Sequence, residues 1–541
     1  MVSAAAQEPG GQFTLAGTVV NAKTGEPLKR AQVQIRRFAV SAGFQGLENR
    51  GATPQVISPG FSASAMTDPS GAFRFTGLIA GDYFVSASRP EFVSDRTALP
   101  RDTTVKLGSN REDVQLTLSP LGVISGKVVD QDGQPMLNVG IAIQQEQIVD
   151  GFRDIVPDRN VHTDDRGMFR VWNLQPGKYY VKAAGRNGGT TLFAGDRAPA
   201  YAARDGFTPL YFGGSRNVRS AAPITIEAGS DAHADLVLTM RPVYRIRGSL
   251  SGFAPHQTVK FELLSGPDDA SITRAGVSGD TGIFEVLDVA PGSYTLRATQ
   301  GETRGEVRVN VTGADVEGVG VTLSPGVDIE YRVQVTDIPK EFKDPDTGQA
   351  VPIEEGAFGQ NCRFDLHPNG HAGQQAGLPI TRGPKPALSG TLPGTYQVTV
   401  VCFGSWVTSA LYGSQDLLAN PIIVVQPGAA PPPVEIMAHF GGGTVRGKVI
   451  PVAAGQMPSV LLVPQFSPNS GPIMAPASAT GSGARVEWSG LAPGDYVLYA
   501  FSRGDEVEFR NPEFLRALTG GTAVRIEAGD NKEITIDTVV K

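Results

Sequence analysis

The sequence predicts an all-β protein, a tandem array of five antiparallel β-sandwich domains. Three observations carry this prediction: a Gly-x-Tyr phrase recurs about every hundred residues, alternating apolar residues follow each copy, and Gly and Pro are abundant. Gly and Pro number 66 and 40 of 541 residues, whereas together they average about 12% of residues. A repeat of this length is a domain rather than a solenoid repeat. Length alone suggests three or four domains at about 150 residues each, so the five copies revise that number upward.

The recurring phrase is a turn that leads into a strand. A tyrosine follows the glycine by two residues, and a proline precedes the glycine in four copies. The pairs are Gly81 and Tyr83, Gly177 and Tyr179, Gly292 and Tyr294, Gly394 and Tyr396, and Gly494 and Tyr496. Because proline fixes φ and glycine accepts a positive φ, a type II turn is expected at each copy. The apolar alternation after each tyrosine predicts a strand with one buried face.

Further strand signals flank each copy. An Asp-containing turn followed by alternating aromatic or apolar residues lies upstream, most clearly at 68–75, 164–171 and 280–286. Each domain opens on a strand, often written Gly-x-Val, and most domains close on another, such as 114–118. Several short strands separated by Gly and Pro turns are typical of an antiparallel sandwich.

Proline marks the junctions between the domains. Pro120, Pro242 and Pro325 follow closing strands, and the run 427–433 marks the fourth junction. The predicted divisions are 1–11 as the remnant of an export signal, then domains 12–119, 120–242, 243–325, 326–438 and 439–541. Such short junctions predict a fairly stiff row of domains. One short helix is expected at 512–518, with Asn511 as its N-cap.

With these motifs in place, each copy resembles the carboxypeptidase regulatory-like domain, a transthyretin-like sandwich of seven strands. The resemblance rests on the opening Gly-x-Val, the Asp-x-x-Gly-x-Phe hairpin and the Leu-x-Pro-Gly-x-Tyr turn. The first three domains carry nearly all of these motifs, and the last two carry about half. The resemblance implies transthyretin-like or immunoglobulin-like sandwiches in a non-catalytic, exported protein of the multi-copy bacterial type. It also implies a carbohydrate-binding-like fold, although a fold does not fix a function.

Charge and targeting signals restrict the partners and the location. Charged residues make up 19% of the chain, the net charge is −7 and the pI is near 5.5, so the chain has no basic footprint for nucleic acid. No apolar run reaches 18 residues, so membrane insertion is not expected. Ala4 and Ala6 form a small-x-small pattern that predicts removal of a signal peptide before Gln7, and a flexible Ala-rich terminus is the alternative. The expected location is extracytoplasmic: secreted, periplasmic or on the cell surface.

The two cysteines fall in the fourth domain. Cys402 continues the alternating face of Tyr396, and Cys362 alternates with Phe364, so both are expected to point inward. A disulfide between them would add about 3 to 4 kcal/mol. Two buried thiols that behave as small apolar groups are the alternative.

No catalytic, cofactor or metal site is expected. The sequence lacks Gly-x-Ser-x-Gly, His-Glu-x-x-His and Walker motifs. His367 and His371 have a zinc-type spacing, but an intervening proline and glycine deny them a helix, so a solvated loop is expected. The sequence at 130–133 begins like a calcium loop and lacks the glutamate that closes one, so a hairpin turn is expected there.

Loops remain as the candidate ligand surface. The segments 37–65 and 185–230 are longer than a sandwich requires, and the second is rich in aromatic residues. The candidate ligand-binding residues are Tyr201, Phe207, Tyr211 and Phe212. Aromatic side chains on a loop can stack on sugars or anchor a protein partner. The alternative is a satellite core that pins the long loop to its own or the neighbouring domain. Trp406 and Tyr412 are lesser candidates.

These observations favour a non-catalytic exported protein that acts as a cell-surface or extracellular scaffold or adhesion-like module. The alternative is a carbohydrate-binding protein that recognises a glycan through loop aromatics. A protein or glycan partner at the cell surface is expected in either case. An accessory subunit with an edge strand for β-augmentation is a further possibility.

Overall fold

The fold is taken from a computed structural model of the chain. The described residues are 11–38, 59–94, 103–149, 151–184, 192–194, 204–265, 273–276, 281–339, 341–343, 350–352, 362–368, 387–402, 405–450, 458–465, 473–476, 478–480, 483–502, 504–536 and 539–540. Nearly all of the regular structure in them is β-strand, as the sequence predicts. None of the described helices is long and apolar enough to cross a membrane.

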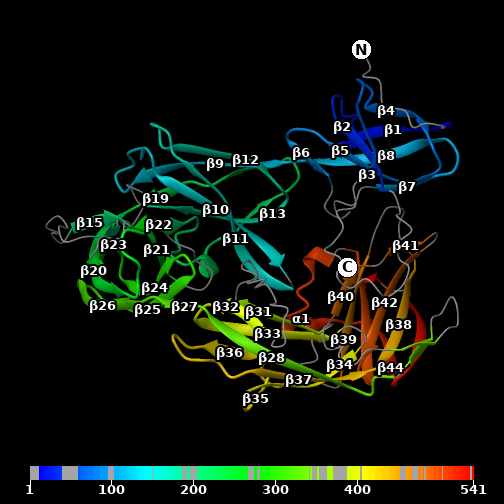
Figure 1. The fold of residues 1–541 in the computed structure, drawn as a ribbon. Helices are drawn as coiled ribbons and strands as arrows, with labels where there is room; N and C mark the ends of the chain where they lie inside the picture. The colour runs from blue at the N-terminus through cyan, green and yellow to red at the C-terminus, as the bar shows by residue number, and fades with distance from the viewer. Residues whose placement is uncertain are drawn as a thin grey trace.

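Five large clusters of buried apolar side chains follow one another along the described chain. We call residues 12–119, 120–242, 243–325, 326–438 and 439–541 units 1 to 5, and each cluster falls inside one unit. That each unit is an independently folding domain stays a prediction. Every cluster lies between two sheets, which makes each unit a β-sandwich (Figure 1).

Unit 1 shows the arrangement in its simplest form. One sheet runs β4 (Ala72–Leu78), β1 (Phe13–Asn21), β8 (Arg111–Pro120) and β6 (Phe92–Ser94). The other runs β3 (Pro59–Met66), β2 (Gln32–Phe38), β5 (Gly81–Ser88) and β7 (Thr103–Leu107).

Unit 2 repeats this order and adds short strands. One sheet, which we call the outer sheet, runs β12 (Met168–Leu174), β9 (Gly122–Asp130) and β18 (Asp231–His233), and β19 (Leu236–Leu238) also pairs with β9. Its inner sheet runs β11 (Phe152–His162), β10 (Gly140–Val149), β13 (Gly177–Ala183) and β16 (Leu210–Tyr211), with β17 (Ile224–Ile226) also on β13. A 3-10 turn, η1 (Val218–Ser220), lies between β16 and β17.

One sheet of unit 3 includes two short strands from the segment that precedes this unit in the chain. One sheet runs β14 (Leu192–Ala194), β23 (Ile283–Val289), β20 (Met240–Ser251) and β15 (Arg204–Phe207), with β26 (Val316–Thr322) also on β20. The other runs β22 (Thr273–Gly276), β21 (Val259–Leu264), β24 (Gly292–Gln300), β25 (Thr303–Val311) and β27 (Ser324–Pro325).

Units 4 and 5 complete the chain. One sheet of unit 4 runs β32 (Ala387–Thr391), β28 (Val327–Thr336), β37 (Val434–Phe440), β34 (Ser405–Tyr412) and β35 (Gln415–Asp416). The other runs β31 (Cys362–Pro368), β33 (Gly394–Cys402) and β36 (Ile422–Val425). Strands β29 (Glu341–Lys343) and β30 (Ala350–Pro352) form a separate pair. Unit 5 has β41 (Ser478–Thr480), β42 (Gly483–Leu491), β38 (Gly443–Val449) and β45 (Asn531–Ile536), facing β40 (Ile473–Pro476), β39 (Ser459–Pro464), β43 (Gly494–Phe501), β44 (Thr522–Ile526) and β46 (Val539–Val540). It also holds η3 (Gly504–Glu506) and helix α1 (Pro512–Ala517), which Asn511 caps as predicted.

Strand pairing is mostly antiparallel, with one parallel pair at the same place in every unit. The first strand pairs in parallel with the closing strand: β1 with β8, β9 with β18 and β19, β20 with β26, β28 with β37, and β38 with β45. The glycine of the opening Gly-x-Val explains this close approach. A Cβ at Gly17, Gly126 or Gly248 would lie 1.8 to 2.1 Å from a carbonyl oxygen of the closing strand, so only glycine fits.

The Gly-x-Tyr phrase forms a tyrosine corner rather than the expected type II turn. In all five units the tyrosine hydroxyl donates to the carbonyl four residues earlier, at 2.7 to 3.1 Å. The phrase glycines Gly81, Gly177 and Gly494 have φ of 154 to 156°, far from the roughly +80° of a type II turn. The left-handed residue stands four positions before the phrase glycine, at Gly77, Asn173, Asp288, Gly390 and Gly490, with φ of 59 to 71°. A bulge in the strand pairing occurs there in every unit.

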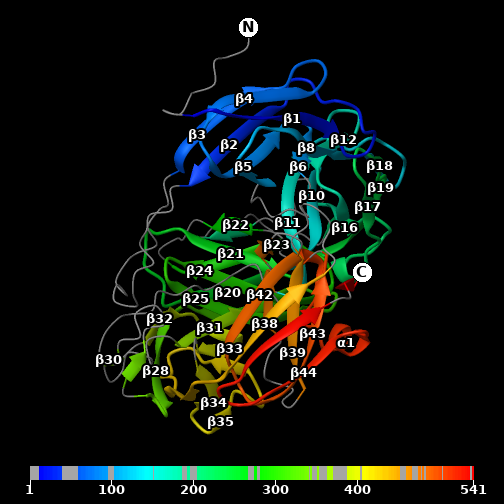
Figure 2. The ribbon, with the colours of Figure 1, turned by 90° about the vertical axis from the view of Figure 1, so that its right-hand side faces the viewer.

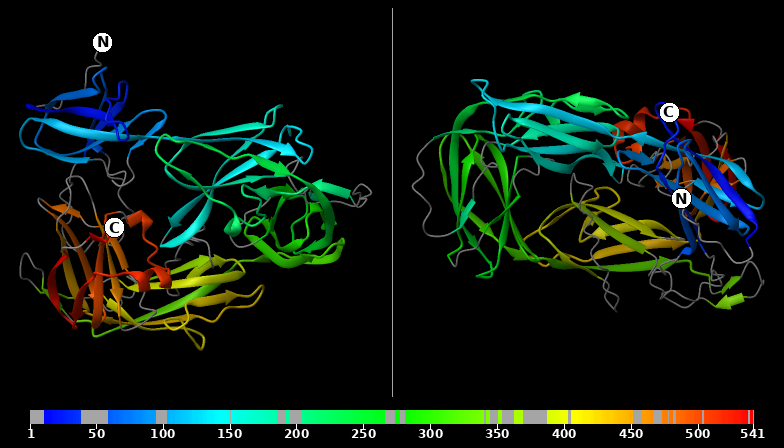
Figure 3. Two further views of the ribbon diagram at one scale, coloured as in Figure 1. Left: turned by 180° about the vertical axis from the view of Figure 1, so that it is seen from behind. Right: turned by 90° about the horizontal axis from the view of Figure 1, so that it is seen from above.

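The five units curl round rather than form a straight row. Units 1 and 2 lie side by side, unit 3 turns the chain, and units 4 and 5 return beneath them (Figures 1 and 2). Seen from above, the chain closes on itself (Figure 3). Unit 5 makes direct contacts with unit 2, described below, and the stiffness of the short junctions stays a prediction.

Candidate functional site

The predicted ligand loop packs against protein. Tyr201 lies outside the described residues. Phe207 and Phe212 are half-buried and pack against the core of unit 2. Tyr211 is 1% exposed and offers no ring face to a ligand. These positions match the satellite-core alternative, and ligand binding by these loop aromatics stays a prediction.

Tyr211 is held by polar groups of the inner sheet of unit 2. Its hydroxyl donates to Gln144 Oε1 at 3.0 Å, and Lys182 Nζ lies 5.2 Å from its ring centroid. Tyr180 and Val218 complete this small cluster. The end of the 185–230 segment therefore extends the inner sheet with β16 beside β13, and the side chains of Tyr211 and Val218 pack on the outward face of that sheet.

The rest of that segment joins unit 2 to unit 3. Backbone pairing places β14 against β23, with Phe193 opposite Glu285, and β15 against β20, with Phe207 opposite Met240. Two strands that precede unit 3 in the chain thus extend a sheet of unit 3. The long insertion is a connector between sandwiches in the part of the chain that the structure describes.

A second junction joins unit 2 to unit 5. The tip of the β10–β11 hairpin meets the segment 507–511, which links η3 to α1. Arg510 N–H donates to the Gly151 carbonyl at 3.1 Å, and its guanidinium lies 5.6 Å from the ring centroid of Phe152. Arg510 Nη1 also donates to Thr399 Oγ1 of unit 4 at 3.2 Å. Arg510 is therefore the point at which units 2, 4 and 5 meet, and we call this contact the hairpin junction.

Charge complementarity supports the hairpin junction. Arg153 Nε donates to Glu508 Oε1 at 3.0 Å, and Arg153 Nη1 donates to Glu146 Oε1 at 2.7 Å. Glu508 also accepts a hydrogen bond from Asn511 Nδ2 at 3.0 Å. The hydrogen bond from Arg153 holds the pKa of Glu508 below its ordinary value, against the opposing effect of burial. The same bond raises the pKa of Arg153. Both groups are therefore charged at neutral pH.

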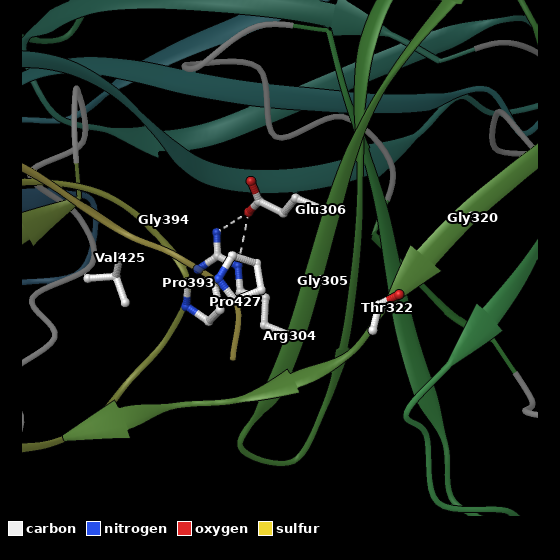
Figure 4. Close-up of a pocket in the computed structure, with 9 residues that line it drawn as sticks. All are labelled: Arg304, Gly305, Glu306, Gly320, Thr322, Pro393, Gly394, Val425 and Pro427. Atoms are coloured by element: carbon white, nitrogen blue, oxygen red, sulfur yellow. Dashed lines mark hydrogen bonds and ion pairs between the residues drawn. The ribbon is translucent and has the colours of Figure 1, made fainter. Parts of the chain in front are cut away.

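A cavity of about 330 Å³ opens between units 3 and 4 (Figure 4). Arg304 and Glu306 of β25 face Pro393, Val425 and Pro427 of unit 4 across it. Burial would raise the pKa of Glu306, but Arg297 and Arg304 outweigh that effect and hold the pKa below its ordinary value. Glu306 is paired with both arginines, so its charge is already compensated within the protein. The residues drawn at this cavity include one carboxylate, that of Glu306, and one hydroxyl, that of Thr322.

The cysteines of unit 4 are joined. Cys362 and Cys402 lie directly opposite each other on β31 and β33 and form a disulfide. Both are buried in the core of unit 4. The disulfide closes a loop of 40 positions in the unit with the weakest repeat motifs.

The acidic turns bind their own backbone. Asp68, Asp130 and Asp164 each accept backbone hydrogen bonds from the residues two and four positions later, at 2.8 to 2.9 Å. This is the hairpin-turn role expected at 130–133. Across the described ranges, no group of three or more His, Cys, Asp or Glu side chains could hold a metal ion. His367 lies on β31, and His371 is outside the described residues.

The lesser aromatic candidates are also engaged. Trp406 stacks on His439 with ring centroids 4.2 Å apart, and His439 Nε2 lies 2.8 Å from Asp337 Oδ2. Tyr412 is half-buried, and burial raises its pKa. Neither ring is presented as an open platform.

Sequence reasoning missed one exposed aromatic. Trp172 on β12 is 57% exposed, the most exposed aromatic side chain among the large apolar residues at the described surface. A signal for it was present: Phe169 and Val171 alternate inward, so Trp172 has to point outward. Arg170 lies on the same outward face.

Comparison with known proteins agrees with the sandwich and its motifs. Residues 14–119 match the carboxypeptidase regulatory-like domain. This regulatory-like domain coincides with unit 1 almost from end to end. The mouse (Mus musculus) protein BOS complex subunit NOMO1 is 24% identical over 317 residues, which cover 53% of this chain and 21% of that protein. The chain thus spans about a fifth of that relative's length.

Solved structures are similar at lower levels. The minor pilin GBS52 of Streptococcus agalactiae is 15% identical, with 43% of this chain and 97% of the pilin covered and a TM-score of 0.23. The TIE protein of Bacillus anthracis is also 15% identical, with 58% of this chain and 51% of that chain covered and a TM-score of 0.17.

Proposed function

We propose that this chain is a non-catalytic, exported protein that serves as an extracytoplasmic scaffold and binding module. The observation that carries the proposal is how the sandwiches are joined. Strands β14 and β15 tie unit 2 to unit 3, and Arg510 ties units 2, 4 and 5 together. Such junctions hold the units in fixed positions and leave their outward faces for display. The match of unit 1 to a regulatory-like domain supports the same role.

The disulfide supports export. Disulfides persist in oxidising compartments and are rare in reducing ones, and Cys362 and Cys402 are the two cysteines of the chain. The test is to quench intact producing cells with acid and then label free thiols with a large maleimide, before and after reduction. We expect no gel shift before reduction and two added labels afterwards. Two labels before reduction would show a reduced, cytoplasmic protein and would overturn export.

The binding role is tested with the intact, oxidised chain. Immobilised protein is probed with a glycan array and with cell-surface extract, and every bound glycan is analysed by mass spectrometry for cleavage. Retention of an intact surface glycan or of a defined surface protein supports the proposal. Turnover of a bound glycan would overturn the non-catalytic role.

Glycan recognition is the second candidate function. The observation that favours it is the exposed Trp172 beside Arg170, rather than the loop aromatics that the sequence suggested. Loss of array binding in a Trp172→Ala variant, with Phe207→Ala unchanged, would separate the two surfaces.

A further inference from the structure

The outward face of the outer sheet of unit 2 is a grid of exposed side chains from three adjacent strands. Met168, Arg170 and Trp172 point outward from β12, because Phe169 and Val171 point into the core. The strand register sets Arg170 opposite Ser125, and Ser125 opposite His233. In Figure 1 this sheet forms the layer of unit 2 that faces away from the rest of the curled chain.

Trp172 differs from the residues at its position in the other units. The corresponding residues are Thr76, Leu287, Ser389 and Ser489. Leu287 is 5% exposed, whereas Trp172 is 57% exposed. Four units therefore place a hydroxyl or a buried side chain where unit 2 exposes an indole, so the exposed ring is particular to unit 2.

Arg170 is unusual in the same comparison. At its position unit 1 has Arg74, paired with Glu112 at 2.9 Å. Unit 3 has Glu285, paired with Arg247 at 3.3 Å, and unit 5 has Glu487, paired with Arg446 at 3.2 Å. Unit 4 has Ala387. Within the described residues Arg170 has no acidic partner, so its guanidinium is available to an external anion.

The surroundings of these two side chains are rigid and polar. Arg159 Nη1 donates to the Trp172 carbonyl at 2.7 Å and fixes the strand from the opposite sheet. Ser125 Oγ lies 3.4 Å from Asp231 Oδ1 and 3.3 Å from His233 Nδ1. His233 and Asp235 have side chains that are 67% and 65% exposed. Donors and acceptors for hydroxyl groups therefore stand one strand away from the indole at Ser125 of β9, and two strands away at Asp231 and His233 of β18.

We propose that this face binds an acidic polysaccharide, one built of uronic acid residues. The indole of Trp172 offers a flat apolar surface to the C–H face of a sugar ring. Arg170, whose Cα lies about 6.8 Å along the strand from that of Trp172 at ordinary strand spacing, pairs through its guanidinium with the carboxylate of the neighbouring sugar by two parallel hydrogen bonds. Asp231, Ser125 and His233 receive the ring hydroxyls.

The composition of the face favours a sugar over a protein. The centre of a protein interface is depleted of charged residues, whereas this face carries Arg170 on the strand of Trp172 and Asp231 and His233 on β18. A flat, charge-rich surface with one aromatic ring suits a ligand that is polar on its edges and apolar on one face. A protein that competed with the sugar for this face would contradict the assignment.

The inference rests on the proposed binding role and is tested separately from it. The intact, oxidised chain is titrated by calorimetry and Trp fluorescence with tetramers of galacturonic, mannuronic and glucuronic acid. Methyl esters of the same tetramers keep the rings and remove the charge. We expect at least one acid tetramer to bind, its methyl ester to bind at least about tenfold more weakly, and added salt to weaken the acid form.

Variants assign the binding to this face. Trp172→Ala and Arg170→Gln are expected to lose at least about tenfold in affinity for the acid tetramer, and Arg170→Gln to leave the methyl ester unchanged. Arg74→Gln, at the matching position of unit 1, is the control and is expected to bind like the parent. Trp172 and Arg170 are exposed, so their variants are expected to fold, and circular dichroism verifies the folding.

Each outcome has a definite meaning. The site is overturned if no acid tetramer binds. It is also overturned if the Trp172→Ala and Arg170→Gln variants bind the acid tetramer as tightly as the parent protein does. Equal binding of acid and ester overturns the acidic class. Cleavage of a tetramer, seen by mass spectrometry, overturns the non-catalytic function instead of the site.

Discussion

The two sheets of unit 2 differ in whether their outward-pointing side chains are buried or exposed. The inner sheet carries Gln144, Tyr180 and Lys182 on its outward side, and all three are buried, with the side chain of Tyr211 packed against them. The outer sheet carries Met168, Arg170 and Trp172, which remain exposed. Both sheets show the same alternation of inward apolar residues. The difference therefore lies in what the rest of the chain covers, and polar strand residues become structural on one face and available on the other.

The sharpest way to break this contrast is to remove Tyr211 from the covered face. Tyr211→Ala deletes a side chain that is 1% exposed, and we expect it to cost about 3 to 5 kcal/mol of unfolding free energy. Tyr211→Phe leaves Gln144 Oε1 without its donor and should cost about 1 to 3 kcal/mol. Both losses of unfolding free energy are measured by chemical denaturation of the full chain, in which the unfolding transition of unit 2 is monitored. A loss below about 0.5 kcal/mol for the alanine variant would mean that the inner face is not covered in solution.

The next largest effect is expected at the hairpin junction. Gly151 has φ of 77°, and a Cβ there would lie 2.7 Å from the ring of Phe509. Gly151→Ala should therefore strain the turn by about 1 kcal/mol and also separate the hairpin from unit 5. Small-angle scattering should show a larger radius of gyration, and limited proteolysis should be faster at the exposed hairpin.

Gly133 provides a matched control for that substitution. It has the same φ of 77° in another turn of unit 2, with nothing within 4 Å of its Cβ position. Gly133→Ala should carry the same backbone strain and leave the overall dimensions unchanged. If both variants expand the protein equally, the hairpin junction is not what holds units 2 and 5 together.

A smaller effect is expected from pH. The pKa of Glu508 lies below its ordinary value because of Arg153, so the pairing stabilises the junction when pH is above the ordinary value of about 4.3. That contribution is lost as pH falls through the lowered pKa. Arg153 is 48% exposed, so we expect only about 1 kcal/mol. Scattering against pH should show expansion at acid pH, and Glu508→Gln should already be partly expanded at neutral pH and lose this acid transition.

The smallest effect is expected on the open face. Trp172→Ala should change the unfolding free energy by less than about 0.5 kcal/mol, because the ring is mostly exposed. Thermal unfolding of Trp172→Ala and Tyr211→Ala side by side compares the loss of stability at the open and the covered face of one sandwich. A loss of several kcal/mol would show that Trp172 is a packing residue and would remove the contrast.

Much of the fold was readable from the chain. The phrase tyrosines and the alternation after them located the central strand of each unit, and the sequence placed both cysteines inward. The parallel pairing of first and last strands was not predicted, because alternation gives the face of a residue and not the direction of its neighbour. The left-handed position at Gly77, Asn173 and Asp288 was readable in principle, since Gly, Asn and Asp are the residues that accept it.

The site was less readable for a different physical reason. Tyr211 and Trp172 are both aromatic residues of unit 2, and their exposures of 1% and 57% depend on segments far away in the sequence. The pairing of β14 with β23 joins positions about ninety residues apart, and no local pattern encodes it. Trp172 could have been placed outward from Phe169 and Val171, but only the assembled chain shows that nothing covers it.

The hairpin junction has a mechanical consequence. Suppose tension is applied between the N-terminal unit and the end of the chain, as on a tether in flowing liquid. The load passes from the β10–β11 hairpin directly into the segment at Arg510, which also contacts Thr399 of unit 4, rather than along the chain through units 3 and 4. When the junction breaks, the length held in those two units is released before any sandwich has to unfold. We therefore expect the chain under tension to lengthen in one step before its sandwiches unfold, and to shorten again when Arg153 pairs with Glu508.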